Sequence, residues 1–504
     1  MKRLFRTKSL DALLAESEDP SRHLKRTLGP IELIALGVGA IIGAGIFATV
    51  GTAAAGGANH VGAGPAIVLS FIITAIGCGF CALCYAEFAS LVPISGSAYT
   101  YSYATLGELV AWIIGWDLII EYAMGNVAVA VSWSGYFAEL LRGFGIDIPL
   151  WLRTDLRTAL RTPGFMDSAP HVGGIPIVFN LPAVVIVALI TWVLVIGIKE
   201  SSRFNTAMVI LKVAILLFFI AVGAFFVKPD NWAPFAPNGW KGIGVGAALI
   251  FFAYIGFDAV STAAEECRNP QKDMPIGMIG SLVICTVMYI VVALVLTGML
   301  PLSDIKGSAE PLAKAFNLLG MGWAAGIVAF GAVIATTAVL LVFQLGQARI
   351  FFSMARDGLL PKSFAAVHPR YRTPHLTTIW TGVAVALLAA FANLDVFVEL
   401  TNIGTLFAFV LVSIAVLILR YRDPHRPRPF RTPWVPFVPL AGIAICIYLM
   451  VNLPVATWWR FGIWLAIGIV FYFLYGYRKS RLAGGPPAPP SFNPASGLPP
   501  SEIR

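Results

Sequence analysis

The sequence predicts an all-α integral membrane protein. Its 504 residues are 58% hydrophobic and only 12% charged, whereas soluble domains carry about 25% charged residues. Apolar stretches long enough to cross a bilayer, which takes about 20 residues, recur along the chain with polar loops between them. Two of these stretches are interrupted by glycine, around Gly43 and around Gly256. Because lipid cannot satisfy the backbone groups of a broken helix, each break must line a protein or water cavity.

Twelve transmembrane helices are expected from the apolar stretches. They cover residues 31–55, 65–91, 106–140, 180–198, 203–227, 242–266, 276–300, 320–354, 376–391, 396–420, 434–451 and 457–477. Most of the 35 Lys and Arg residues lie in loops on the side of the N-terminus. The positive-inside rule therefore predicts that both termini are cytoplasmic. Residues 1–29 would form a cytoplasmic N-terminal segment, and the proline-rich residues 482–504 a disordered cytoplasmic tail.

The interrupted helices are the first and the sixth, which predicts a 5+5 inverted repeat with discontinuous helices 1 and 6. Residues 30–227 would form repeat 1, with helices 1–5, and residues 242–420 would form repeat 2, with helices 6–10. Residues 434–477 would add helices 11 and 12. Because five is odd, the second repeat crosses the membrane in the opposite sense. Secondary transporters with this arrangement bind their substrates near the midplane, between the broken helices.

Four residues surround the break in helix 1: Ile41, Gly43, Ala44 and Gly45. The half-helix that begins there would present free N–H groups and its positive dipole end, so an anion such as a carboxylate fits this position. The alternative is that Gly39 and Gly43, spaced as GxxxG, only allow two helices to pack closely.

Five residues surround the break in helix 6: Phe252, Ala253, Tyr254, Ile255 and Gly256. Unwinding there would free carbonyl groups that accept hydrogen bonds from an ammonium group. Since one break prefers an anion and the other a cation, the expected ligand is a zwitterion, as amino acids are. Gly256 alone would also fit a packing position or a kink. For Asp258, capping of the second half-helix and a direct contact with the ligand are both open.

Lys212 lies about 14 Å along helix 5, too deep for its stem to reach the interface comfortably. An ionisable group at that depth indicates a function. One hypothesis is that Lys212 occupies the place of a coupling cation and exchanges a proton. The alternative is a fixed positive charge that ties helix 5 to backbone carbonyls of helix 1.

Three further polar residues on apolar helices are candidates for the pocket or its polar network. Asp117 and Glu121 are four residues apart and share one face of helix 3. They could pair with Lys212 or contact a cationic substrate, although contacts between helices are the alternative. Thr337 on helix 8 would face the site or bond its own i−4 carbonyl.

Other functions find no support in the sequence. No Walker loop indicates ATP hydrolysis, and the six histidines form no HExxH pattern for zinc. Cys78, Cys81 and Cys84 are spaced like iron–sulfur ligands, but the first and last do not lie on a single helix face and no fourth ligand follows. The basic residues are divided among loops rather than gathered with aromatics, which argues against nucleic acid despite the formal charge of +9. We expect no cofactor, no metal site and no enzymatic activity.

Six segments together match one family pattern. They are residues 37–47 (GVGAIIGAGIF), 84–89 (CYAEFA), 93–99 (PISGSAY), 115–122 (GWDLIIEY), 265–270 (EECRNP) and 347–361 (QARIFFSMARDGLLP). With these segments, and over roughly residues 7–480, the chain resembles the amino acid–polyamine–organocation superfamily, specifically its bacterial cationic-amino-acid-transporter-like branch. The resemblance implies the leucine-transporter fold.

The resemblance also implies roles for individual residues. The substrate carboxylate would bind the amides around Ala44 and Gly45, and the α-ammonium the carbonyls of Phe252, Ala253 and Ile255. Lys212 matches the family lysine that stands at the sodium position of sodium-coupled relatives, which favours proton coupling or sodium-independent exchange. Ala44 replaces the Ser or Thr often found there, so affinity or side-chain preference would differ.

These observations predict a transporter that moves amino acids by alternating access, coupled to protons and independent of sodium. A facilitative cationic amino acid carrier or exchanger is the alternative, and a non-transporting amino-acid sensor is an alternative of another class. The expected location is the bacterial inner membrane, with the lipid bilayer, protons and the amino acid as partners. A small membrane subunit would leave no mark in this sequence and stays open.

Overall fold

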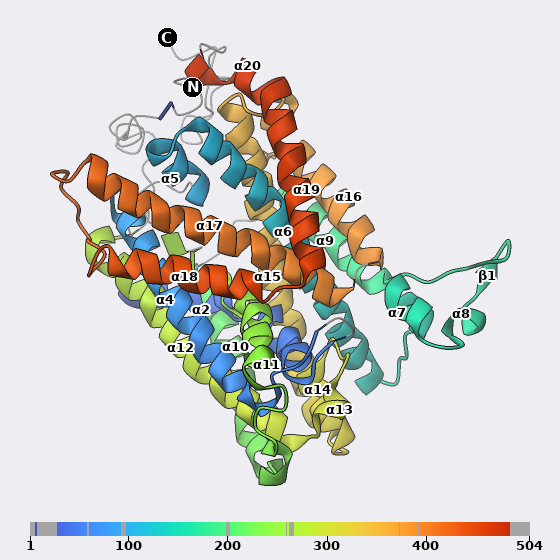
Figure 1. The fold of residues 1–504 in the computed structure, drawn as a ribbon. Coiled ribbons are helices and arrows are strands. Elements are labelled where there is room, and N and C mark those ends of the chain that lie inside the picture. Colours follow the sequence, from blue (N-terminus) through green and yellow to red (C-terminus); the bar gives the residue numbers. More distant parts are fainter. Residues whose placement is uncertain are drawn as a thin grey trace.

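The computed structural model describes residues 6–7, 28–57, 60–91, 97–197, 202–258, 260–261, 267–371, 373–391 and 393–483. In these residues the protein is almost entirely helical, and Figure 1 shows the helices packed together in one bundle. The sheet described is a hairpin of β1 (His171–Val172) and β2 (Ile175–Pro176), which pair antiparallel. Most of the predicted N-terminal segment 1–29 and tail 482–504 lies outside the described residues.

Seven helices of the described chain are long and apolar enough to cross a membrane. They are Gly64–Leu91, which includes α4 (Ile67–Leu91), α6 (Glu108–Gly143), Thr206–Phe226 with most of α10 (Ser202–Gly223), α12 (Pro270–Met299), α15 (Gly322–Arg356), α17 (Leu394–Arg422), and Val455–Lys479, which begins with α19 (Val455–Phe471). An eighth span consists of α2 (Pro30–Ile41) and the segment Gly45–Ala55, which meet at a bend of 44°. This bend confirms that the first helix is broken.

Shorter apolar helices stand at the four remaining predicted positions. They are α9 (Leu181–Ile196), α11 (Gly239–Ile250) with the 3-10 turn η6 (Phe251–Ala253), α16 (His375–Phe391) and α18 (Phe437–Val451). The described structure therefore has seven or eight candidate spans by length and composition, and the total of twelve stays a prediction. Helix 6 was expected at 242–266, but its regular part ends at Ile250, and residues 262–266 lie outside the described chain.

Short elements connect the long helices: α5 (Ser97–Thr105), η3 (Leu150–Leu152), α7 (Leu156–Arg161), α8 (Phe165–Ser168), η5 (Pro229–Trp232), α13 (Leu302–Ile305), α14 (Pro311–Leu318) and η8 (Lys362–Ala365). Within the spans, η4 (Ala224–Phe226) ends Thr206–Phe226, and η9 (Tyr472–Gly476) and α20 (Tyr477–Lys479) end Val455–Lys479, after which η10 (Arg481–Ala483) follows. Figure 1 shows α7, α8 and β1 projecting sideways from the bundle. Inside the bundle, α6 packs along α15 and α17, while α2 packs along α12.

Local sequence signals explain where the first helix begins. Pro30 occupies the first helical position of α2, where its missing N–H costs nothing. The Glu32 carboxylate accepts a hydrogen bond from the Gly29 N–H at 3.0 Å, which satisfies a donor at the helix start. Leu28, just before this cap, forms a parallel bridge with Cys267.

Described residues from the two ends of the chain lie together. The Arg6 guanidinium donates to the Leu482 carbonyl, and the Arg6 carbonyl accepts from the Glu108 N–H at 3.0 Å. The buried Glu108 carboxylate in turn accepts from Tyr472 at 2.9 Å and from Ser480 at 2.5 Å. Leu482 and Ala483, expected in the disordered tail, thus belong to η10 instead.

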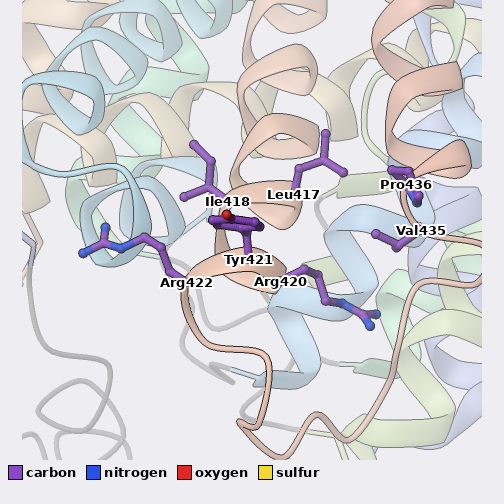
Figure 2. A pocket seen from close by; sticks show the side chains of 7 residues that line it. All are labelled: Leu417, Ile418, Arg420, Tyr421, Arg422, Val435 and Pro436. Atoms are coloured by element: carbon purple, nitrogen blue, oxygen red, sulfur yellow. The ribbon is translucent and has the colours of Figure 1, made fainter.

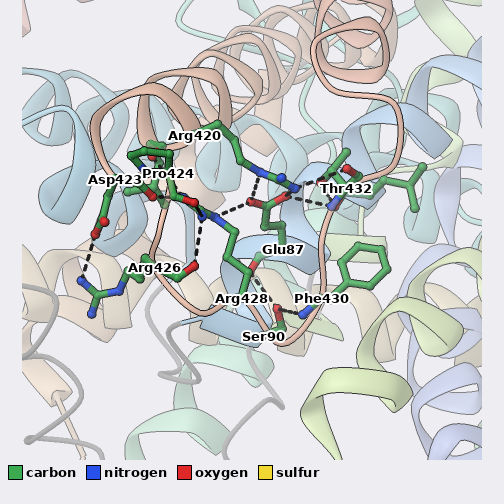
Figure 3. A network of polar contacts seen from close by, with 11 residues as sticks. Glu87, Ser90, Arg420, Asp423, Pro424, Arg426, Arg428, Phe430 and Thr432 are labelled. Carbon is green, nitrogen blue, oxygen red and sulfur yellow. Dashed lines mark hydrogen bonds and ion pairs between the residues drawn. The ribbon is translucent and has the colours of Figure 1, made fainter.

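A second polar network joins the end of α4 to the loop between α17 and α18 (Figure 3). The Glu87 carboxylate, 1% exposed, receives two hydrogen bonds of 2.8 Å from Arg420. Its oxygens also accept from the Thr432 N–H at 2.8 Å and lie 3.2 Å from Nε of Arg428. The second guanidinium also donates to backbone carbonyls, including that of Asp423 at 2.7 Å. One carboxylate therefore holds two cations and fixes the course of the loop.

Replacing Glu87 by Gln should destabilise the protein by about 3 kcal/mol, because removing one partner of a buried ion pair leaves the other charge uncompensated. The measurement is the thermal unfolding midpoint of the detergent-solubilised protein, with Asp230→Asn at an exposed position as control. A midpoint equal to that of the control would contradict this role of Glu87.

Candidate functional site

The break in the first helix leaves carbonyl groups that have no partner further along α2. Ile42, which follows α2, has an extended backbone (φ −73°, ψ 104°), and its N–H still bonds the Val38 carbonyl at 2.9 Å. Beyond Ala44 the chain resumes as a π-helical turn, η1 (Gly45–Thr49), and then as α3 (Val50–Ala55). The last carbonyls of α2 therefore need partners from other helices.

Two polar side chains from other helices supply them. Lys212 of α10, 2% exposed, donates from Nζ to the Gly39 carbonyl at 2.7 Å and to the Ile42 carbonyl at 3.1 Å. The Tyr289 hydroxyl of α12 donates to the Ile41 carbonyl at 3.0 Å. A cation is favourable at this position because the C-terminal end of a helix carries negative partial charge. These are the contacts expected if Lys212 ties helix 5 to helix 1, and its exchange of a proton stays a prediction.

On the other side of the break, a new half-helix begins. Its first amides have no carbonyl one turn earlier to bond, so they are the available donors. Ala44 and Gly45 are both buried there. The Phe47 N–H bonds back to the Gly43 carbonyl at 3.3 Å, and the Phe47 carbonyl accepts from the Tyr136 hydroxyl of α6.

The second break follows α11. The 3-10 turn η6 ends at Ala253, and the Tyr254 N–H bonds the Phe251 carbonyl at 2.9 Å. Gly256 has a φ of +120°, which only glycine adopts without strain. Asn402 of α17 donates from Nδ2 to the carbonyls of Ala248 and Leu249 at 2.8 and 3.1 Å. An intramembrane side chain therefore bonds carbonyls near the end of the half-helix at this break too.

The two breaks contact each other through their glycines. A Cβ at position 45 would overlap the backbone of Ala253, and a Cβ at position 256 would lie 2.7 Å from the Ala40 carbonyl oxygen. Backbone from the first break thus lies directly against backbone from the second. Of the predicted residues, Gly45 thus lies against Ala253, and Gly256 lies against Ala40 of α2.

The two glycines of the GxxxG pattern, Gly39 and Gly43, each lie against a valine of another helix. A Cβ at Gly39 would lie 2.6 Å from Cγ2 of Val209 on α10, and one at Gly43 would lie 2.7 Å from Cγ2 of Val339 on α15. Each glycine therefore allows a different helix to approach.

The acidic candidates lie on the α6–α17 side of the site. Asp117 is fully buried, and a Cβ at Gly404 would lie 2.8 Å from its Oδ1. Within the described residues, neither Asp117 oxygen nor Oε2 of Glu121 has a hydrogen-bond partner. Asp258 lies in the turn after the second break, where its charge interacts with that of Glu121. In the described chain Lys212 forms no ion pair with Asp117 or Glu121.

Thr337 is held between two helices. Its hydroxyl donates to the Val333 carbonyl at 2.7 Å, one turn earlier in α15, and accepts from Nε1 of Trp133 on α6 at 2.8 Å. The hydroxyl hydrogen is therefore already used within the protein.

Sequence reasoning missed Tyr289, Tyr136 and Asn402. Each is a polar side chain within an apolar stretch, and an unexplained polar group at membrane depth was the available signal. Their targets are backbone carbonyls of other helices, which no local pattern identifies.

A family model described as "Amino acid permease" matches residues 28–473. The chain belongs to the amino acid permease family. It is 49% identical to the methylthioribose transporter of Bacillus subtilis (strain 168), covering 96% of this chain and 100% of the relative. It is also 49% identical to the branched-chain amino acid permease BcaP of the same strain, covering 95% and 99%. Cationic amino acid transporter 1 of Arabidopsis thaliana is 35% identical, covering 94% and 86%.

The permease is thus an integral membrane transporter and not an enzyme. The resemblance to the amino acid–polyamine–organocation superfamily is confirmed. The residues of both breaks, the lysine and Asn402 all lie within the matched region.

The contact between the breaks should be intolerant of added volume. Gly45→Ala forces a methyl group into the backbone of Ala253, and overpacking of this kind costs about 1–3 kcal/mol. Gly79→Ala in α4 is the matched control, because a Cβ there meets nothing within 4 Å. Thermal unfolding midpoints of both purified variants test this. Equal midpoints for Gly45→Ala and wild type would mean that the two breaks are not in contact.

A histidine outside the spans gives a prediction for pH. The His60 side chain, 3% exposed, follows α3 and has Nε2 3.8 Å from Oδ2 of Asp395 on α17. Burial lowers the pKa of His60, but the contact and charge of Asp395 outweigh it, with smaller contributions from Val61 and Glu399, so the pKa lies above its usual 6.5. The charged histidine is therefore favoured by folding.

Since the folded-state pKa is raised, the stabilisation by His60 is fully present below pH 6.5 and is lost as the pH rises through the folded-state value. The difference in unfolding midpoint between wild type and His60→Gln should accordingly be largest at about pH 5.5 and shrink towards about pH 8. In a protein that carries Asp395→Asn, the effect of His60→Gln on the midpoint should no longer depend on pH. In a protein that carries His171→Gln, in the exposed hairpin, the pH dependence should remain. A difference that is constant or grows with pH would refute the pairing.

Proposed function

We propose that the permease carries a neutral amino acid across the bacterial inner membrane by alternating access, coupled to protons and independent of sodium. The proposal includes twelve spans in the leucine-transporter fold, with helices 1–5 (residues 30–227) and 6–10 (242–420) as inverted repeats, and with both termini cytoplasmic. The meeting of Arg6 with Leu482 supports placing the two ends on one side.

The observation that carries the proposal is the contact between two helix breaks of opposite polarity. The half-helix starting at Gly45 would direct its first amides into the junction, and the 3-10 turn that follows α11 brings the backbone of Ala253 there. The amides fit an α-carboxylate, and the carbonyls of Phe252, Ala253 and Ile255 fit an α-ammonium group. Ile41, Tyr254 and Gly256 would complete this substrate site.

The side chains around the junction favour a neutral, apolar substrate. Val339 lies directly against Gly43, where a Cβ would be 2.7 Å from its Cγ2. Phe252 and Ile255 are each 5% exposed. An amino acid with a branched aliphatic side chain matches such surroundings, in agreement with the name of the relative, the branched-chain amino acid permease BcaP. The buried Glu121 and Asp117 keep a cationic substrate as the alternative.

Methylthioribose is a second candidate, because the relative named for it is equally similar. As a neutral thiosugar it has neither a carboxylate nor an ammonium group. The opposite polarities of the two breaks would then serve no purpose, which favours the amino acid.

Lys212 is the proposed coupling residue. Protonated, it bonds the Gly39 and Ile42 carbonyls and holds α2 against α10. Loss of the proton would remove the charge that faces the negative helix end and weaken this hold, which would release the inner half of helix 1. Such a step links proton movement to alternating access. Facilitated exchange or a non-transporting sensor would need no such step.

The test is uptake into proteoliposomes of labelled leucine, arginine and methylthioribose, each with and without an inward proton gradient. We expect leucine uptake to rise about tenfold with the gradient and the response to vanish in Lys212→Ala, while Lys241→Ala, at an exposed position, behaves as wild type. Leucine exchange without a gradient should persist in Lys212→Ala, which shows that the variant is folded.

Uptake of arginine or methylthioribose alone would overturn the substrate assignment. If leucine uptake by Lys212→Ala still rose with the proton gradient, the coupling role of Lys212 would be overturned. Binding of leucine without any uptake would favour the sensor.

A further inference from the structure

An apolar slot opens between the last turn of α17 and the segment that precedes α18 (Figure 2). Its volume is about 530 Å³, within the range of roughly 300–1,000 Å³ found for small-molecule sites. Leu417 and Ile418 form one wall, and Val435 and Pro436 the other. Tyr421 lies near the centre, with Arg422 on one side and Arg420 on the other, the side of Val435 and Pro436 (Figure 2).

The surroundings of the slot are typical of a membrane interface. Three large aromatic side chains are exposed around it: Tyr421, Trp434 and Phe437 are 90%, 78% and 61% exposed. Aromatic residues of this kind gather where the hydrocarbon region meets the lipid headgroups. The apolar walls therefore face acyl chains, and the arginines lie at headgroup level.

The segment around the slot carries a strong excess of positive charge. Residues 420–437 contain five arginines and a single carboxylate, Asp423. Glu87 neutralises part of this charge through Arg420 and Arg428 (Figure 3). Arg422 is exposed, and within the part of the chain that the structure describes its side chain makes a single long hydrogen bond, of 3.4 Å to the Thr105 carbonyl. Its guanidinium can therefore donate hydrogen bonds to a phosphate oxygen.

We infer that this slot is a binding site for an anionic phospholipid. One acyl chain lies against the apolar lining of Leu417, Tyr421 and Val435, and the lipid phosphate pairs with Arg422. Both parts of the ligand are required by the structure, because apolar walls exclude a free phosphate and the adjacent arginines favour an anion over a zwitterionic headgroup. The Glu87 network supports the site, since it fixes the loop that forms the second wall.

The test is lipid retention measured by native mass spectrometry of the full-length protein in detergent. Phosphatidylglycerol and phosphatidylcholine with identical acyl chains are titrated separately. We expect wild type to bind phosphatidylglycerol at least fivefold more tightly than phosphatidylcholine. Arg422→Gln should remove this preference, Val435→Trp, which fills the slot, should weaken both lipids, and the exposed Arg161→Gln on α7 should change neither.

Two controls keep the outcome interpretable. Thermal unfolding in lipid-free detergent shows whether each variant is folded, and glycerol 3-phosphate should fail to compete, because it lacks the chains that fill the slot. Competition by glycerol 3-phosphate would mean that the site recognises the phosphate alone and not the acyl chains of a lipid. Equal binding of the two lipids, or unchanged binding in both slot variants, would overturn the inference.

Discussion

Interrupting a helix inside a membrane exposes backbone polar groups, and every other feature of the central site follows from how those groups are satisfied. At the first break, Lys212 and Tyr289 take the carbonyls at the end of α2. At the second, Asn402 takes carbonyls near the end of α11. The protein itself thus binds the carbonyls of Gly39, Ile41 and Ile42 at the first break and those of Ala248 and Leu249 at the second. In the proposed function, the first amides of the half-helix at Gly45 are the donors for the ligand.

Two further polar clusters hold the helices around this site. Glu108 joins the start of α6 to residues near both ends of the described chain. Glu87 joins the end of α4 to the loop after α17. In each case a buried carboxylate is surrounded by donors from segments far apart in the sequence, which repays part of the cost of removing it from water. These two clusters hold helix ends, whereas Lys212, Tyr289 and Asn402 bond the backbone beside the breaks.

Much of the architecture could be predicted from the sequence because its signals are local. Apolar length placed α6 and α15 within a few residues, and the glycines at 43 and 45 located the first break. Partners that depend on tertiary packing could not be found in this way. Asn402 bonds carbonyls about 150 residues earlier in the chain. Likewise the regular part of helix 6 ends at Ile250, just before the expected break, because a 3-10 turn at Phe251–Ala253 that is as apolar as α11 follows it.

The side chains that bond the two breaks are chemically unequal. An amine can exist with or without its charge, whereas the amide of Asn402 has one form at any physiological pH. Under the proposed repeat, Lys212 on helix 5 and Asn402 on helix 10 occupy corresponding places in the two halves. Only the contact made by Lys212 would then change on protonation, and the hydrogen bonds of Asn402 would stay the same at any pH. If Lys212 is the coupling residue, as proposed, protons would act on the first break and not on the second.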